Sequence, residues 1–182
     1  MNNIPKLSKF FLTLTLLFGS LWYGSYVIRY LLMYQIFDGP TLPLKSYVKP
    51  EINLDAIFIS INPVFVMNMG LYGLFILVFV LFLFTSKISL KNNGWLFIST
   101  LIVVLAIPYE VFLFFKYDMQ WSLTVNTMQF NASQLHDALV ERIRASGTYA
   151  IVMILSHLVL FYLMVFRPFT KTKPELNSPD EN

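Results

Sequence analysis

Residues 63–84 read PVFVMNMGLYGLFILVFVLFLF and contain no charged side chain. A bilayer hydrocarbon core about 30 Å thick needs about 20 apolar residues in a helix to cross it. Lipid offers no partner to the backbone groups of an open strand, so an isolated apolar span of this kind is helical. This stretch therefore predicts a transmembrane helix.

Three further apolar stretches are long enough to cross a bilayer, which places the expected crossings at residues 9–34, 63–85, 95–115 and 147–166. Hydrophobic residues make up 57% of the 182-residue chain and charged residues 13%, against about 25% charged in an ordinary soluble domain. A soluble fold of this size could not hide so much apolar surface. We expect one all-α integral membrane domain over residues 1–182, a four-transmembrane-helix bundle.

The ends of these crossings carry helix-capping signals. Asn62 followed by Pro63 predicts an N-cap with proline at the first helical position, where its missing N–H costs nothing. Ser146 is the expected cap of the fourth crossing. The first crossing follows Lys6 and Lys9 and has no small-residue cleavage site after it, which favours an uncleaved anchor over a signal peptide.

The distribution of Lys and Arg predicts the orientation of the chain in the membrane. One side carries seven basic residues in the N-terminal segment, the second loop and the tail: Lys6, Lys9, Lys87, Lys91, Arg167, Lys171 and Lys173. The other side carries five basic residues (Lys45, Lys49, Lys116, Arg142 and Arg144), together with six acidic ones. Cytoplasmic loops are enriched in Lys and Arg, so both termini are expected in the cytoplasm. Abundant Phe, Ile, Lys and Asn favour a bacterial inner membrane.

Two long loops, residues 35–62 and 116–146, are then expected on the extracytoplasmic side, where they would form a small cap. Alternating apolar residues at 57–61 and again within 121–130 predict short strands in that cap. Four crossings with a β-containing outer cap are similar in outline to claudin-like proteins, but the tryptophan and cysteines that mark those proteins are missing here.

The second loop also predicts a helix. Residues 131–134, Asn-Ala-Ser-Gln, form a capping-box pattern that opens an amphipathic segment with Leu135, Leu139 and Ile143 on one face. Residues 170–182 are polar and interrupted by prolines, without hydrophobic periodicity, so this cytoplasmic tail is expected to be disordered.

Arg29 and Glu110 are ionisable residues within the expected crossings, where charge is costly. Arg29 lies about 30 Å from the start of its crossing, and Glu110 lies about 22 Å from Trp95 at the start of the third crossing. The two are therefore at similar depth, and Pro108 near Glu110 should expose a backbone carbonyl there. They could line a substrate path, form a structural ion pair, or leave Arg29 to reach the headgroups. We favour a structural role.

His157 lies near the middle of the fourth crossing, and Asn68 lies between two methionines in the second. His157 could ligate a haem or metal, relay protons, or make a hydrogen bond to a neighbouring helix. The interhelical hydrogen bond is the favoured interpretation. We expect no metal site and no cofactor. The chain has no cysteine, which excludes disulfides, thiolate metal sites and cysteine nucleophiles.

No enzyme motif accompanies these residues in the sequence. The leading interpretation is therefore a non-enzymatic integral membrane protein, acting as a subunit, assembly factor or scaffold through its outer cap and helix faces. Its expected partners are the lipid bilayer and a membrane protein or a second copy of itself. Nucleic acid is not expected, because the basic residues flank apolar segments. One alternative is a small oligomeric transporter or channel that uses Arg29, Glu110 and Asn68. The other is a redox or metal-binding membrane protein that uses His157.

Overall fold

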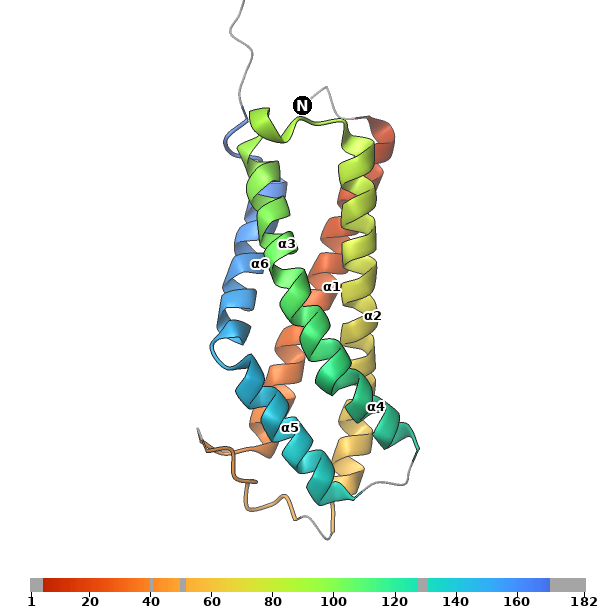
Figure 1. Cartoon of the computed structure of the whole chain (residues 1–182), viewed down its shortest axis with the longest axis vertical. Coiled ribbons are helices and arrows are strands. Elements are labelled where there is room, and N and C mark those ends of the chain that lie inside the picture. The colour runs from red at the N-terminus through yellow and green to blue at the C-terminus, as the bar shows by residue number, and fades with distance from the viewer. Residues whose placement is uncertain (1–4, 40, 50–51, 128–130, 171–182) are drawn as a thin grey trace, which may run out of the picture.

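A computed structural model describes residues 5–39, 41–49, 52–127 and 131–170 as a bundle of helices (Figure 1). The disorder predicted for residues 170–182 falls outside the described residues, apart from Thr170. In chain order the elements are α1 (Lys6–Ile36), α2 (Leu54–Ser86), the 3₁₀ turn η1 (Leu90–Asn92), α3 (Gly94–Leu113), the π-helical turn η2 (Phe114–Asp118), α4 (Met119–Asn126), α5 (Ala132–Ser146) and α6 (Tyr149–Phe166).

Within the described part of the chain, four helices are long and apolar enough to cross a membrane: α1, α2, the continuous helix from α3 through α4, and α6. The expected crossings lie within them, except that α6 begins two residues later than predicted. At 1.5 Å per residue the 18 residues of α6 span about 27 Å, close to the hydrocarbon thickness of a bilayer. The 31 residues of α1 and 33 of α2 reach about 46 and 50 Å, so both extend well beyond α6.

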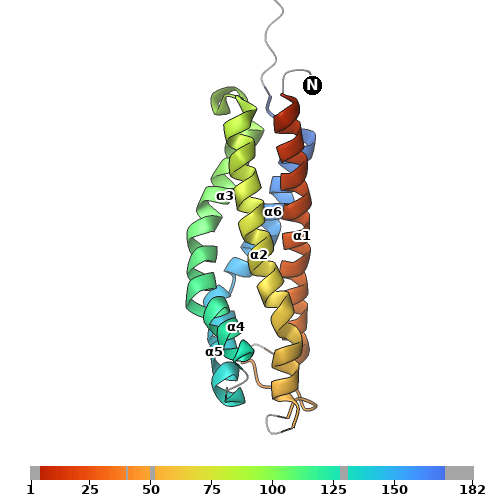
Figure 2. The ribbon, with the colours of Figure 1, turned by 90° about the vertical axis from the view of Figure 1, so that its right-hand side faces the viewer.

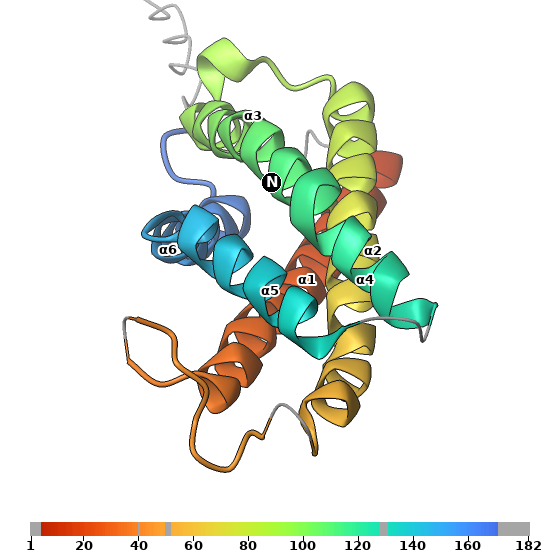
Figure 3. The same cartoon turned by 60° about the horizontal axis from the view of Figure 1, so that its bottom comes forward.

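The helices run alternately up and down the bundle, with α1 packed along α2 and α3 packed along α6. Four crossings return the chain to its starting end, so the N-terminal end of α1 and the end of α6 lie at the same end of the molecule (Figures 1 and 2). The opposite end, named the distal end below, holds α4, α5 and the connection from α1 to α2 (Figure 3).

The strands expected at residues 57–61 and within 121–130 are wrong where the structure describes them, because residues 57–61 and 121–126 are helical; residues 128–130 lie outside the described residues. Residues 57–61 lie in the first turns of α2, and residues 121–126 lie in α4. Leu54, Phe58, Ile61 and Phe65 are all buried, at the spacing of one helix face. Burial of this face in the folded protein favours a helix, although the local alternation of apolar residues is typical of a strand.

Two predicted helix starts are also wrong. Pro63 lies inside α2, which begins nine residues earlier, and the Asn62 side chain does not cap it but donates a hydrogen bond to Oδ1 of Asn126 at 2.8 Å. Ser146 ends α5, and Thr148 occupies the N-cap position of α6.

The amphipathic helix predicted after residue 131 is confirmed as α5. The Asn131 side chain accepts a hydrogen bond from the backbone N–H of Ser133 at 2.9 Å, as an N-cap residue does. Leu135 and Leu139 face inward and are buried, while Ile143 packs beside them.

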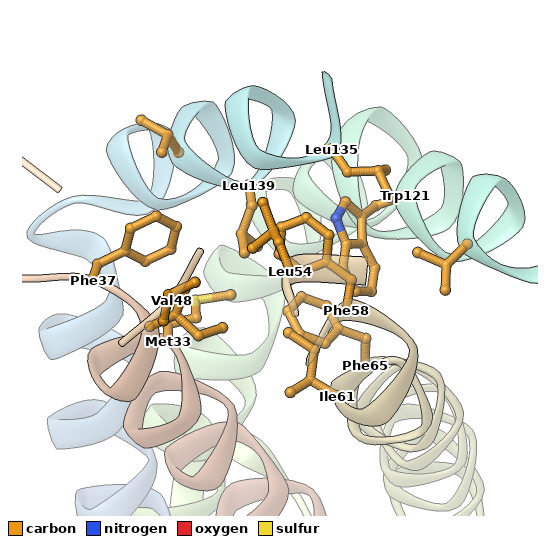
Figure 4. Packing of buried hydrophobic residues seen from close by; sticks show 13 residues of the cluster. Met33, Phe37, Val48, Leu54, Phe58, Ile61, Phe65, Trp121, Leu135 and Leu139 are labelled. Atoms are coloured by element: carbon orange, nitrogen blue, oxygen red, sulfur yellow. The ribbon is translucent and has the colours of Figure 1, made fainter. Parts of the chain in front are cut away.

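Aromatic and aliphatic side chains fill the bundle along its length. The central cluster is formed by rings of α2 and residues of α1, α3 and α6, including Phe75, Phe79, Phe82, Trp95 and Leu160. A second cluster lies at the distal end, where α5 covers the ends of α1 and α2 (Figure 4). In that cluster Leu135 and Leu139 of α5 meet Phe58 and Phe65 of α2 and Trp121 of α4.

Candidate functional site

Three buried charged side chains meet where α5 joins the bundle. The Asp118 carboxylate of η2 accepts a hydrogen bond from Arg29 Nη1 of α1 at 2.9 Å. It also accepts from Arg142 of α5, through Nε at 2.9 Å and Nη2 at 3.3 Å. The exposed fractions of the three side chains are 1%, 5% and 2% for Arg29, Asp118 and Arg142. We call these three residues the Arg–Asp–Arg cluster.

The π-helical turn η2 places Asp118 in this cluster. Along α3 the buried face includes Ala106, Glu110 and Leu113, at steps of four and three residues. The next buried residue is Asp118, five residues on, and the buried face then continues with Trp121. The wider turn moves the inward face by one residue. Without it, residue 117 would face inward and Asp118 would lie to the side.

Arg142 is held charged by its carboxylate partner. Burial by itself lowers the pKa of Arg142, but the adjacent Asp118 outweighs that effect, and the pKa is raised above its ordinary value. Asp118 therefore serves as the shared counter-ion of two guanidinium groups that are both out of contact with solvent.

Arg29 makes further contacts beyond Asp118. Its guanidinium carbon lies 5.2 Å from the ring centroid of Phe65, 5.4 Å from that of Tyr26 and 5.8 Å from that of Tyr30. These distances are within cation–π range. Its Nε and Nη2 atoms are buried and have no hydrogen-bond partner in the described part of the chain. Arg29 thus points into the bundle and not towards its outer surface.

The structure corrects the expected pairing of Arg29 with Glu110. The acid that Arg29 contacts is Asp118, while Glu110 accepts a hydrogen bond from the Tyr26 hydroxyl at 3.4 Å. Asp118 and Arg142 were not among the sequence candidates, because both were counted as charges of an extracytoplasmic loop. Arg142 had a signal in the sequence, because it lies three residues after Leu139 on the inward face of the predicted helix after residue 131.

Asn68 links α2 to the same network. Its Nδ2 donates to Ser25 Oγ at 2.8 Å, and its Oδ1 accepts a longer hydrogen bond from Arg29 Nη1 at 3.4 Å. A continuous series of polar contacts therefore runs from Ser25 through Asn68 and the Arg–Asp–Arg cluster. The gap beside Asp118 and Arg142 leaves no room for a water molecule.

His157 lies apart from this network, in the middle of the bundle. It is fully buried, and Nδ1 lies 2.9 Å from the backbone oxygen of Met153 in its own helix. Its ring centroid is 4.6 Å from that of Trp22 and 6.1 Å from that of Phe75. Nε2 has no partner among the described residues, so the expected hydrogen bond to a neighbouring helix is not formed there. His157 is a packing residue in this arrangement.

Comparisons with protein-family models, with curated proteins and with solved structures found no match.

Proposed function

We propose that the chain is a non-enzymatic integral membrane protein that serves as a subunit, assembly factor or scaffold of a membrane complex. The observation that carries the proposal is the Arg–Asp–Arg cluster. Its charges bind α1, η2 and α5 to one another, and the gap beside Asp118 and Arg142 has no room for a water molecule. The costly buried charges are thus used to hold the protein's own helices in place.

The outer face of α2 supplies a surface on which a partner helix can pack. Met67, Gly70, Leu74 and Leu77 are exposed, and their spacing places them on one face of the helix. Nothing lies within 4 Å of the position that a Cβ would take at Gly70 or at Gly73. Small residues on a transmembrane helix let a second backbone come close, which favours this face as the partner-binding surface.

The distal end would then be an extracytoplasmic cap. This assignment rests on the Lys and Arg distribution, which favours cytoplasmic termini. The outer face of α5 carries exposed Asp137, Glu141 and Arg144, a polar surface suited to water and to a soluble part of a partner. A bacterial inner membrane is the location that the composition favours.

The proposal is tested by affinity purification of the chain from native membranes in a mild detergent, followed by mass spectrometry of the retained proteins. A stoichiometric partner is expected with the wild-type chain and loss of that partner with Gly70→Leu. Gly24→Leu on α1 is the matched control, because its added Cβ also meets nothing within 4 Å. Recovery of the chain alone, or only with copies of itself, would contradict the proposal.

A transporter or channel is the second candidate, and the polar series from Ser25 to Arg142 is the observation that favours it. On the side of the termini this series is followed by the rings of Trp22, Phe75 and His157, which pack against one another. The test is ion or solute flux through proteoliposomes that contain the chain. A transporter requires measurable flux that Glu110→Gln abolishes while expression is unchanged.

A further inference from the structure

A groove of about 440 Å³ lies at the distal end between two walls, one formed by η2 and α4 and the other by α5. These elements run side by side in every view (Figures 1–3). Lys116 on the first wall and Glu141 on the second are the two charged residues of the lining. Neither forms an ion pair within the described part of the chain. The groove therefore offers one positive and one negative group on opposite walls.

Both charges lie at the end of the groove that faces the apolar part of the bundle. The chain runs away from that part along η2 and α4, and Lys116 precedes the other lining residues of its wall. It runs back along α5 towards α6, and Glu141 is the last lining residue on that wall. Gln120 and Gln134 lie farther out and supply amide groups.

The depth of this end is marked by two tyrosines, Tyr109 of α3 and Tyr149 at the start of α6. The rings of Tyr109 and Tyr149 lie 3.9 Å apart, and the Tyr109 hydroxyl donates to the backbone oxygen of Ala145. Tyrosines of this kind mark the boundary between hydrocarbon and headgroups. Lys116 Nζ folds back over the Phe112 ring at 5.3 Å. Phe112 is three residues beyond Tyr109, about 4.5 Å along the helix, and we assign the ammonium at this level to the headgroup layer.

We propose that this groove binds the headgroup of a phospholipid that carries both a phosphate and a primary ammonium, as phosphatidylethanolamine does. Lys116 contacts the phosphate, and Glu141 accepts hydrogen bonds from the ammonium. The acyl chains lie along the exposed rings of Phe112 and Phe115, which adjoin Lys116 on the outer surface. Glu141 disfavours a purely anionic headgroup, because the like charges repel each other.

The test reconstitutes the full chain in nanodiscs that contain equal amounts of phosphatidylethanolamine, phosphatidylglycerol and phosphatidylcholine. Native mass spectrometry then measures the lipids that remain bound after release from the nanodisc. Wild type is expected to retain phosphatidylethanolamine about fivefold over the other two, the preference that one exposed ionic contact gives. Glu141→Gln should remove this preference, and Lys116→Gln should lower the retention of all three lipids.

Lys91→Gln, an exposed lysine in η1 at the opposite end of the bundle, is the matched control and should behave as wild type. Lys116 and Glu141 are both exposed, so their variants are expected to unfold at the wild-type temperature, which is measured alongside. Equal retention of the three lipids, a preference for phosphatidylglycerol, or unchanged retention in both groove variants would overturn the proposal. Displacement of the lipid by an equal concentration of soluble glycerophosphoethanolamine would also overturn it, by showing that the ligand is a free solute.

Discussion

Asp118→Asn should destabilise the protein severely, because it removes the carboxylate shared by two buried guanidinium groups. Arg29 Nη1 and Arg142 Nε each lie 2.9 Å from one of its oxygens. With about 4 Å between charge centres and an effective dielectric constant of about 20, each pair contributes about 4 kcal/mol of attraction. The substitution also removes the desolvation cost of the carboxylate itself. The expected net loss in the free energy of unfolding is therefore about 3–5 kcal/mol, as for other buried pairs that lose one partner.

The assay is equilibrium unfolding of the purified protein in mixed micelles of a mild detergent and SDS, followed by tryptophan fluorescence. Asp137→Asn is the matched control, since its side chain is 78% exposed on the same end of the molecule, and it should change stability by less than about 0.5 kcal/mol. The triple variant Arg29→Met, Asp118→Leu, Arg142→Met removes all three charges, and should recover most of the loss. Wild-type stability in Asp118→Asn, or a triple variant no better than Asp118→Asn, would refute the reasoning.

Three smaller predictions concern packing and capping, and the same unfolding assay measures the first two. Gly19→Ala places a Cβ 3.0 Å from an aromatic ring of a neighbouring helix and should lower the free energy of unfolding by about 1–3 kcal/mol. The Cβ of Gly24→Ala meets nothing within 4 Å, so that variant should be near neutral. Equal effects of the two substitutions would show that the close packing at Gly19 is absent. His157→Ala should cost about 2–4 kcal/mol by leaving a cavity beside Trp22, and His157→Leu less than about 1.5 kcal/mol; two equally harmful variants would instead indicate a role for the imidazole nitrogens. Asn131→Ala removes the N-cap of α5 and should cost about 1 kcal/mol, seen as faster amide hydrogen exchange in the first turn of α5; unchanged exchange would contradict the capping role.

The strand predicted at residues 57–61 is wrong because of tertiary packing. Residues 57–61 alternate in a way typical of a strand, yet they lie in a helix, because Leu54, Phe58, Ile61 and Phe65 bury one face against α5 and Trp121. Local alternation over five residues is a weaker signal than burial along about three helical turns. Pro63 then falls inside α2 and not at its start.

The partner of Arg29 could not be found by matching depths along straight helices. Such matching pairs Arg29 with Glu110, as expected from residue counts. The π-helical turn shifts the inward face by one residue and turns Asp118 towards Arg29. The local composition of residues 114–118 does not predict that turn.

The amino-acid sequence by itself determined that this chain has four apolar helices of membrane-spanning length and one amphipathic helix before the last of them. The reason is that the length and polarity of a segment decide whether it is stable in lipid or in water. It also showed that Arg29 needs a partner that compensates its positive charge, since an isolated charge in such a helix is costly. The tertiary structure alone decided which groups supply that compensation. Asp118 reaches Arg29 only after η2 has rotated one helix, and α5, by folding back onto the bundle, brings Arg142 to the same carboxylate. Contacts between residues so distant in sequence depend on the packing of three elements at once, which no local pattern records.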